Sequence, residues 1–247
     1  MARRKIEHPD GWTTILGPSR DGKYLHLDEN SSRYVFEAIP LQDLQREFEQ
    51  ARNSTEKAEL SEELQSIIIP RRFQIEHAIC FGLGSFCRHT TQRGTSMRQL
   101  LAFMDICANL QKGGNPIQAS IQDPVLTATD KNFLSSHGLE ILDRGDGFEK
   151  ITAKTFVFLA FIPKRLWRAH LHQLQKSPLF ISPDVTSIQD NISQAEFTDA
   201  TDQFDVAFED MTTEREKLPF PVDEKHSPGF YGLKIYIKAQ DGDDVAI

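Results

Sequence analysis

Strand-like and helix-like segments alternate along residues 75–182, and this alternation constrains the fold more than any other feature of the sequence. Short apolar runs typical of strands are in most cases separated by segments with apolar residues at helical spacing. The predicted strands are 75–81, 117–122, 139–142, 155–162 and 179–182. Repeats of this length predict an α/β fold, namely a three-layer Rossmann-like and mostly parallel sheet with helices on both faces.

Capping residues and apolar patterns refine this prediction. One helix is predicted to begin near Ser96, which has a suitable glutamine three residues later, and another begins at Thr127 with Asp130 as its capping partner. Residues 155–162 are almost continuously apolar, which is typical of a central parallel strand covered on both faces. Residues 231–237 alternate apolar and polar side chains, so we expect a last strand at an edge of the sheet.

The first seventy residues do not follow this pattern. Residues 1–39 hold only short β-like pieces between turn residues. Two amphipathic helices follow, one after Pro40 and a second one that Pro70 ends. We therefore divide the chain into an N-terminal lead-in with a helical extension, residues 1–70, and a core domain, residues 71–247, on which the extension packs.

Negative charge is concentrated in residues 184–226. This segment holds twelve acidic and three basic residues, whereas the rest of the chain is close to neutral, and the whole chain has a net charge of −8. Because so many carboxylates could not be buried without partners, we expect an acidic surface insertion there, with one short helix near residues 204–211. The chain has no basic stripe with interleaved aromatic residues, which argues against a nucleic-acid surface.

The longest apolar runs are much shorter than the roughly 20 residues that cross a bilayer. The first residues also turn polar too soon for a secretory signal. We therefore expect no membrane partner and a location in the cytoplasm, with the nucleus as a second location. Cys80, Cys87 and Cys107 form an odd set without a CxxC pair, so we expect reduced and mostly buried thiols rather than disulfides or a zinc site.

A glycine turn, Gly82-Leu83-Gly84-Ser85, follows the first strand of the predicted core. Glycines at such a turn let backbone N–H groups approach a phosphate. A standard dinucleotide is not expected, because Cys87 stands at the third glycine position of the fingerprint and the acid that ends the next strand comes too late in the chain. Two interpretations stay open: a tight turn that packs a helix closely, or a nucleotide-like or S-adenosylmethionine-like ligand held in a variant way.

Other candidate ligand residues are expected around this turn. Asp123 ends a strand, where open α/β sheets bind ligands, and its carboxylate could accept hydrogen bonds from a ribose. Because Pro124 follows, the pair could instead form an ordinary turn before the next helix. Arg88 and His89 lie in the loop after the first core strand, and Lys164 lies near a helix N-terminus, where its charge opposes the helix dipole. These three could meet an anionic ligand or could be solvated.

Catalytic and metal-binding patterns are weak. There is no GxSxG elbow, and Cys87 with His89 lacks an identifiable third group that would orient the histidine. His170 and His172 are two residues apart on one predicted helix and therefore cannot chelate one metal ion from a single face. The sequence identifies no cofactor, and we expect no metal site.

Several short motifs occur in an order and spacing that resemble one protein family. They are Phe81-Gly82-Leu83-Gly84-Ser85, then Gln122-Asp123-Pro124 before a helix ending at Gly138, then the run 155–162 with Pro163 and a tryptophan-bearing helix, and finally Phe230-Tyr231-Gly232-Leu233-Lys234-Ile235. The chain resembles the "sensitivity to red light reduced" (SRR-like) family of plants, animals and fungi, as a fungal-type member. The resemblance covers residues 70–183 and 229–237, and it implies a regulatory or signalling role of the kind found in a circadian or light response.

Three functions are compatible with the sequence. We favour a regulatory binding module that uses the Rossmann-like core to hold a nucleotide-like small molecule. The enzymatic alternative is an S-adenosylmethionine-dependent transferase, which is weakened by the lack of an acid just before Gly82. The third is a pure protein-interaction module with a vestigial pocket, in which the acidic segment or the amphipathic helices would contact a protein partner.

Overall fold

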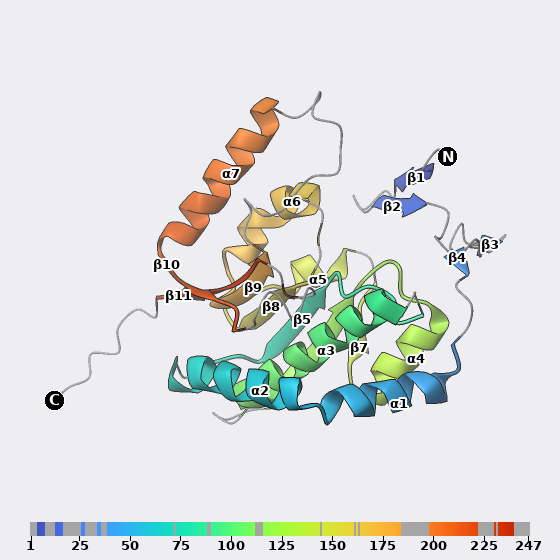
Figure 1. The fold of residues 1–247 in the computed structure, drawn as a ribbon. Coiled ribbons are helices and arrows are strands. Elements are labelled where there is room, and N and C mark those ends of the chain that lie inside the picture. Colours follow the sequence, from blue (N-terminus) through green and yellow to red (C-terminus); the bar gives the residue numbers. More distant parts are fainter. Residues whose placement is uncertain are drawn as a thin grey trace.

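A computed structural model places a seven-stranded sheet between two layers of helices (Figure 1). The structure describes residues 39–71, 73–87, 90–111, 116–143, 145–160, 164–183, 198–221 and 232–239, the single residues Ile162 and Phe230, and four short strands near the amino terminus. These are β1 (Arg4–Glu7) paired with β2 (Thr13–Leu16), and β3 (His26–Leu27) paired with β4 (Tyr34–Val35). The β-like pieces predicted in the first 39 residues are therefore confirmed.

The large sheet has the strand order β10-β11-β9-β8-β5-β6-β7. Its strands are β5 (His77–Phe81), β6 (Gln118–Gln122), β7 (Glu140–Ile141), β8 (Thr155–Leu159), β9 (Leu179–Pro183), β10 (Arg215–Pro219) and β11 (Leu233–Lys238). Strands β5 to β9 are parallel, and β11 runs antiparallel to both of its neighbours. The predicted α/β fold with a mostly parallel sheet is confirmed.

Strand β8 lies in the middle of this order, and all five of its side chains are buried. Its continuous apolar sequence predicted this position, because a central strand is covered on both faces. Phe156 and Phe158 contact Phe103 of α3 (Thr90–Gln111) on one face, with ring centroids 5.9 Å and 6.1 Å from that of Phe103. Val157 and Leu159 belong to the hydrophobic cluster on the opposite face.

Helices divide between the two faces of the sheet in chain order (Figure 1). One face is covered by α1 (Leu41–Arg52), α2 (Thr55–Ile68), α3 and α4 (Ala128–Ser136), with a short 3-10 turn (Ile69–Arg71) after α2. The other face is covered by α5 (Asp146–Glu149), α6 (Lys164–Leu174) and α7 (Thr198–Thr213). Within the described ranges every helix is too short or too polar to cross a bilayer.

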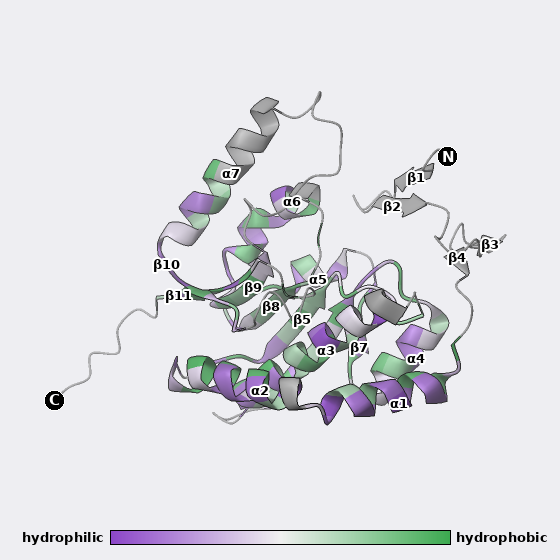
Figure 2. Ribbon diagram, viewed as in Figure 1, coloured by the Kyte–Doolittle hydropathy of each residue, from purple (hydrophilic) through white to green (hydrophobic). Residues whose placement is uncertain are grey.

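The two predicted N-terminal helices are confirmed as α1 and α2, and both show bands of hydrophilic and hydrophobic residues (Figure 2). Phe48 of α1 is buried and meets Phe133 of α4 edge-on, with ring centroids 5.4 Å apart. Lys57 of α2 forms an ion pair with Asp105 of α3 at 3.0 Å. This helical extension therefore packs on the same face of the sheet as α3 and α4.

The prediction that a helix begins near Ser96 was wrong. Helix α3 begins at Thr90, and Ser96 is buried inside it rather than at its cap. Ser96 with Gln99 resembled a capping box, and Gly94 within the first turns costs a helix about 1 kcal/mol relative to alanine. Packing outweighs that cost here, because Met97 and Leu100 are buried in the hydrophobic cluster on this face.

The last strand is not at an edge, and part of the acidic segment is not a surface insertion. Strand β10, which carries the edge, and helix α7 both lie within residues 184–226. Strand β10 was not predicted because an edge strand pairs on one side only and tolerates charged residues such as Glu216 and Lys217. In α7 the acids Glu209 and Asp210 are exposed, which leaves the opposite side of the helix free to pack.

Buried aromatic contacts attach α7 to the sheet. The ring centroid of Phe208 lies 5.2 Å from that of Trp167 on α6 and 5.7 Å from that of Tyr236 on β11. Directly after α7, the nearly buried Arg215 donates hydrogen bonds to the carbonyl oxygens of Ser177 at 2.8 Å and of Gln175 at 2.9 Å. Helix α7 and strand β10 thus belong to the folded core.

We predict that Phe208→Ala lowers the free energy of unfolding by about 3–5 kcal/mol, as expected when a buried aromatic side chain is removed. Val206→Ala is the matched control, because Val206 lies two residues away on α7 and is 57% exposed. Its effect should stay within about 0.5 kcal/mol. Urea unfolding followed by circular dichroism measures both. Equal stabilities of the two variants would contradict the assignment of α7 to the core.

Candidate functional site

The glycine turn after β5 lies where the order of the strands reverses. Strand β5 pairs with β6 on one side and with β8 on the other, and the chain visits β6 and β7 before it crosses to β8. The backbone N–H of Ala160, which follows β8, donates to the carbonyl of Phe81 at 2.9 Å. Open α/β sheets bind their ligands outside the carboxyl ends of the strands at such a point.

Both glycines of the turn have a backbone conformation that other residues rarely adopt. The φ angles of Gly82 and Gly84 are 72° and 80°. The N–H of Gly82 donates to the carbonyl of Gln122 at 3.3 Å and so extends the pairing of β5 with β6. Leu83 between them is buried in the hydrophobic cluster on the α3 and α4 face, which anchors the turn.

Asp123 connects the glycine turn to the loop after β6. Its Oδ2 atom accepts a hydrogen bond from the N–H of Gly84 at 2.7 Å, and its Oδ1 atom accepts one from the N–H of Val125 at 2.9 Å. The expected convergence of the turn and Asp123 at neighbouring strand ends is therefore observed. Pro124 is half-buried in the turn that is closed by the hydrogen bond from Val125 to Asp123. Asp123 therefore also stabilises this turn, as the alternative interpretation of the Asp-Pro pair expected.

Ser85 faces the interior of the protein. Its side chain is fully buried, and its hydroxyl donates to Oδ2 of Asp130 at 2.7 Å. The same oxygen of Ser85 accepts a hydrogen bond from the N–H of Cys87 at 3.1 Å. Both the donor and the acceptor functions of the hydroxyl are thus used inside the protein.

Asp130 is fully buried and collects donors from two loops. Besides Ser85, it accepts hydrogen bonds from the N–H of Phe86 at 2.9 Å and from the N–H and the hydroxyl of Thr127 at 2.8 Å and 2.9 Å. The predicted capping box of Thr127 and Asp130 at the start of α4 is confirmed. The sequence showed this local role, but it gave no signal for the long-range bonds that fix the glycine turn to α4.

The structure does not place every candidate. Arg88 and His89 lie outside the described residues. Lys164 is the first residue of α6, which starts after β8 as predicted, but its side chain also lies outside the described part. The role of these three residues in ligand binding stays a prediction.

Cys87 is a poor candidate for a nucleophile. Its side chain is buried, its Sγ atom lies 3.4 Å from the hydroxyl oxygen of Thr127, and burial raises the pKa of its thiol. Burial also raises the pKa of Cys80 and Cys107, and all three cysteines are free. Since the thiolate is the reactive form, burial lowers the reactivity of these thiols.

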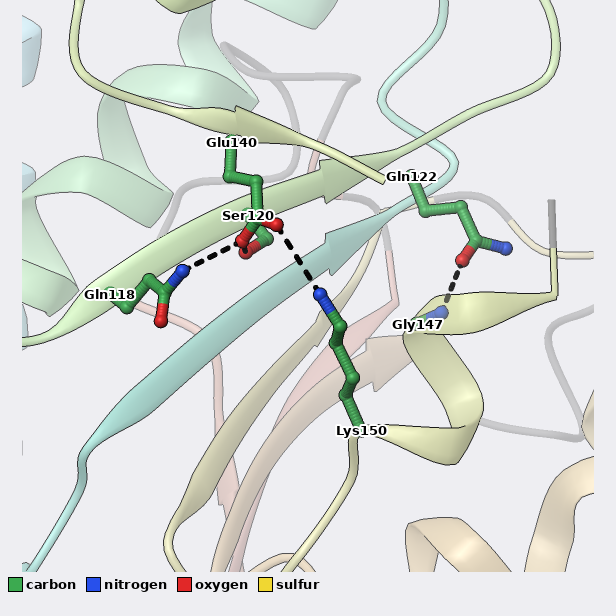
Figure 3. A network of polar contacts seen from close by, with 6 residues as sticks. All are labelled: Gln118, Ser120, Gln122, Glu140, Gly147 and Lys150. Atoms are coloured by element: carbon green, nitrogen blue, oxygen red, sulfur yellow. Dashed lines mark hydrogen bonds and ion pairs between the residues drawn. The ribbon is translucent and has the colours of Figure 1, made fainter. Parts of the chain in front are cut away.

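Polar side chains also line the face of β6 that α5 covers (Figure 3). Glu140 of β7 accepts hydrogen bonds from Gln118 at 2.9 Å and Ser120 at 3.0 Å, and Lys150 donates to it at 3.3 Å. The Ser120 hydroxyl is the main cause of a lowered pKa of Glu140. At the carboxyl end of the same strand, Gln122 accepts a hydrogen bond from the N–H of Gly147 at 2.7 Å. Gln122 was not among the ligand residues predicted from the sequence.

His170 lies at the boundary between the buried and the exposed side of α6, as its place on an apolar helical stripe indicates. Its ring stacks on that of Phe148 with centroids 4.0 Å apart, and its backbone interrupts the regular geometry of α6. Desolvation is the main cause of its lowered pKa, and His172 adds to it. Among the described residues, no group of three or more histidine, cysteine or acidic side chains could hold a metal ion.

Comparison with family models identifies the family. The SRR1 domain model matches residues 47–237, and the chain belongs to this family. The match begins within α1 and ends in β11, so it includes the glycine turn, Asp123 and Asp130. Comparison with curated proteins finds no match.

Solved structures with a similar fold include three bacterial proteins. A candidate O-methyltransferase from Klebsiella pneumoniae shares 15% identity, with 83% of this chain and 93% of that chain covered and a TM-score of 0.45. An O-methyltransferase from Bacillus cereus in complex with SAH shares 14%, with 80% and 90% covered and a TM-score of 0.43. A candidate caffeoyl-CoA O-methyltransferase from Staphylococcus aureus shares 12%, with 82% and 93% covered and a TM-score of 0.41.

We predict that Asp130→Asn lowers the free energy of unfolding by about 3 kcal/mol or more, because the new amide group would face hydrogen-bond donors in a buried site. Asp210→Asn serves as the control, since Asp210 is exposed on α7. It should change stability by no more than about 0.5 kcal/mol. Chemical denaturation compares the two variants with the wild type. An Asp130→Asn protein as stable as the control would show that the buried carboxylate does not hold the turn.

Proposed function

We propose that this SRR1 domain is a regulatory binding module that binds a nucleoside-like small molecule at the carboxyl ends of β5 and β6. The observation that carries the proposal is the position of the Asp123 carboxylate, 2.7 Å from the Gly84 nitrogen at the turn. In sheets of this type an acid at the end of the second strand accepts hydrogen bonds from a ribose. The regulatory role follows from the family resemblance.

The distance of Asp123 along the chain does not oppose this proposal. Asp123 comes 39 residues after Gly84, which is later than in the dinucleotide fingerprint. Most of the extra length is in α3, which spans Thr90–Gln111. Because β6 still pairs directly with β5, the acid reaches the same place above the sheet as an acid at the usual spacing.

Charge at the site favours the nucleoside over a phosphate. The Gly84 N–H, which would otherwise approach a phosphate, already donates to a carboxylate. Asp143 and Asp146, which follow β7, are exposed at the same edge of the sheet and add negative charge. A ribose diol donates hydrogen bonds to carboxylates, whereas a phosphate would be repelled by them.

The groups around the turn support binding rather than covalent catalysis. The Ser85 hydroxyl is used by Asp130, and burial raises the pKa of the Cys87 thiol. The Ser85 hydroxyl is fully buried and so is not exposed to a substrate, and the Cys87 thiol lacks the lowered pKa that a nucleophilic cysteine needs.

The acidic edge also supports a second candidate, an S-adenosylmethionine-dependent transferase. The sulfonium of that molecule is positively charged, and carboxylates such as Asp123, Asp143 and Asp146 attract a cation. The two candidates share the ribose contact but differ in the charge of the ligand. Separate titrations with adenosine and with S-adenosylmethionine distinguish them.

We predict that Asp123→Asn weakens adenosine binding at least about tenfold, since hydrogen bonds to a charged acceptor contribute about 1.5–3 kcal/mol. Isothermal titration calorimetry measures the affinity. Asp43→Asn is the control, because it removes the same charge from α1, and it should bind like the wild type. Both variants are first checked for cooperative unfolding.

The outcomes separate the candidate functions. Equal adenosine affinity in Asp123→Asn and in the wild type would remove Asp123 from the site. Wild-type protein that binds S-adenosylmethionine at least about tenfold more tightly than adenosine, a difference of 1.4 kcal/mol, would favour the transferase. Absence of binding to either compound would leave the protein-interaction module as the function.

A further inference from the structure

Gln122 is the last residue of β6 and directly precedes Asp123. Its side chain is 2% exposed and lies on the face of the sheet that α5 covers. Gln118 and Ser120 share this face because side chains alternate along a strand. Their hydroxyl and amide groups both donate to Glu140. Gln122 differs from them, because it lies at the end of the strand, apart from these hydrogen bonds to Glu140 (Figure 3). Its backbone carbonyl accepts a hydrogen bond from Gly82 of the glycine turn.

The orientation of the Gln122 amide is fixed by chemistry. Gly147 donates its backbone N–H to Oε1 of Gln122 at 2.7 Å, and an N–H can only donate. The oxygen must therefore face Gly147, and the Nε2 group must point to the other side, as Figure 3 shows. Nε2 is buried, and among the residues that the structure describes it has no hydrogen-bond acceptor.

Close packing keeps this amide in place. A Cβ atom on Gly147 would lie 2.5 Å from Oε1 of Gln122 and 2.7 Å from Cε1 of Phe81, so only glycine allows α5 to approach this far. The ring of Phe148, the next residue, stacks on that of Phe81 with centroids 4.3 Å apart. The Gln122 side chain thus packs against α5 beside Phe81 of β5.

A buried amide without an acceptor is destabilising, by about 1–3 kcal/mol. Apolar residues occupy the neighbouring positions on this face, including Phe81, the direct partner of Gln122 in the register of β5 and β6. A methionine or leucine at position 122 would fill similar space without the unsatisfied Nε2 group, but the N–H of Gly147 would then lose its acceptor. An unsatisfied buried donor calls for an explanation, and its place at the strand end next to Asp123 makes a hydrogen bond to a ligand one explanation that can be tested.

We propose that Gln122 is a specificity residue whose Nε2 group donates a hydrogen bond to a ring nitrogen of a purine base. This inference rests on the proposed nucleoside function and deepens it. Asp123 and Gln122 lie next to each other at the carboxyl end of β6, and their side chains leave the strand toward opposite faces. A nucleoside that lies across this end of the strand can therefore present its sugar to Asp123 and its base to Gln122. The ligand then offers donors to Asp123 and an acceptor to Gln122, a combination that a simple anion or a simple cation lacks.

The first test compares two matched variants of β6. Gln122→Met keeps the length and the apolar stem but removes the Nε2 donor together with the Oε1 acceptor of the Gly147 N–H, so its cooperative unfolding is checked first. Gln118→Met makes the same change at an exposed position on the same face. In calorimetric titrations we expect Gln122→Met to bind adenosine about tenfold or more weakly than the wild type. Gln118→Met should bind adenosine with unchanged affinity.

The second test distinguishes a direct contact from a structural role. Adenosine analogues in which ring nitrogen 1, 3 or 7 is replaced by carbon each lack one acceptor. The wild type should bind one of these analogues about tenfold more weakly than adenosine. Gln122→Met should bind that analogue and adenosine equally, because the contact is already lost.

Three results would overturn the inference. If Gln122→Met loses the same factor for adenosine and for all three analogues, the residue only supports α5. If it binds adenosine like the wild type, Gln122 has no role in specificity, although the nucleoside function stands. If the wild type binds no adenosine, the proposed function fails and this inference fails with it.

Discussion

The buried carboxylate of Asp130 determines the arrangement of the site. It accepts four hydrogen bonds from Ser85, Phe86 and Thr127, and so it joins the loop after β5 to the start of α4. A buried charge is tolerated only where such donors surround it. Because the loop is fixed in this way, the N–H of Gly84 faces Asp123 rather than solvent. The glycine turn is therefore part of a polar network within the protein.

The contact between Gly84 and Asp123 changes the chemistry expected of a glycine turn. Glycine turns at this place in α/β sheets commonly bind phosphate through backbone N–H groups. Here the carboxylate of Asp123 accepts the hydrogen bond from the N–H of Gly84 and places a negative charge beside the turn. Neutral or cationic ligands with hydrogen-bond donors suit such a site better than anions do. The exposed carboxylates of Asp143 and Asp146 reinforce this preference at the same edge.

The sequence predicted the features that depend on local pattern. The apolar run of β8, the glycine turn, the capping box of α4 and the meeting of Asp123 with Gly84 all follow from periodicity, capping chemistry and the topology of alternating strands and helices. It did not predict β10, because that strand is charged and pairs on one side only. It also misplaced the start of α3, where tertiary packing outweighs the effect of Gly94.

Long-range polar contacts were the other features that the sequence could not show. Ser85 and Asp130 lie 45 residues apart, and only the fold brings the hydroxyl to the carboxylate. Ser85 therefore looked like a ligand residue although it is an internal one. Gln122 was overlooked for a related reason. The sequence pattern does not show that this glutamine at a strand end is buried. Only the structure shows that its oxygen accepts a hydrogen bond from Gly147 and that its nitrogen has no acceptor among the described residues.

The ratio of the dissociation constants for adenosine 5′-monophosphate and adenosine, obtained by calorimetry at low ionic strength, tests whether the carboxylate at Gly84 favours a sugar diol and repels a phosphate. Adenosine should bind at least about tenfold more tightly than the monophosphate, because like charges close together at a protein surface repel by roughly 1–4 kcal/mol. Tighter binding of the monophosphate would show that the turn binds phosphate and would contradict the preference for a nucleoside.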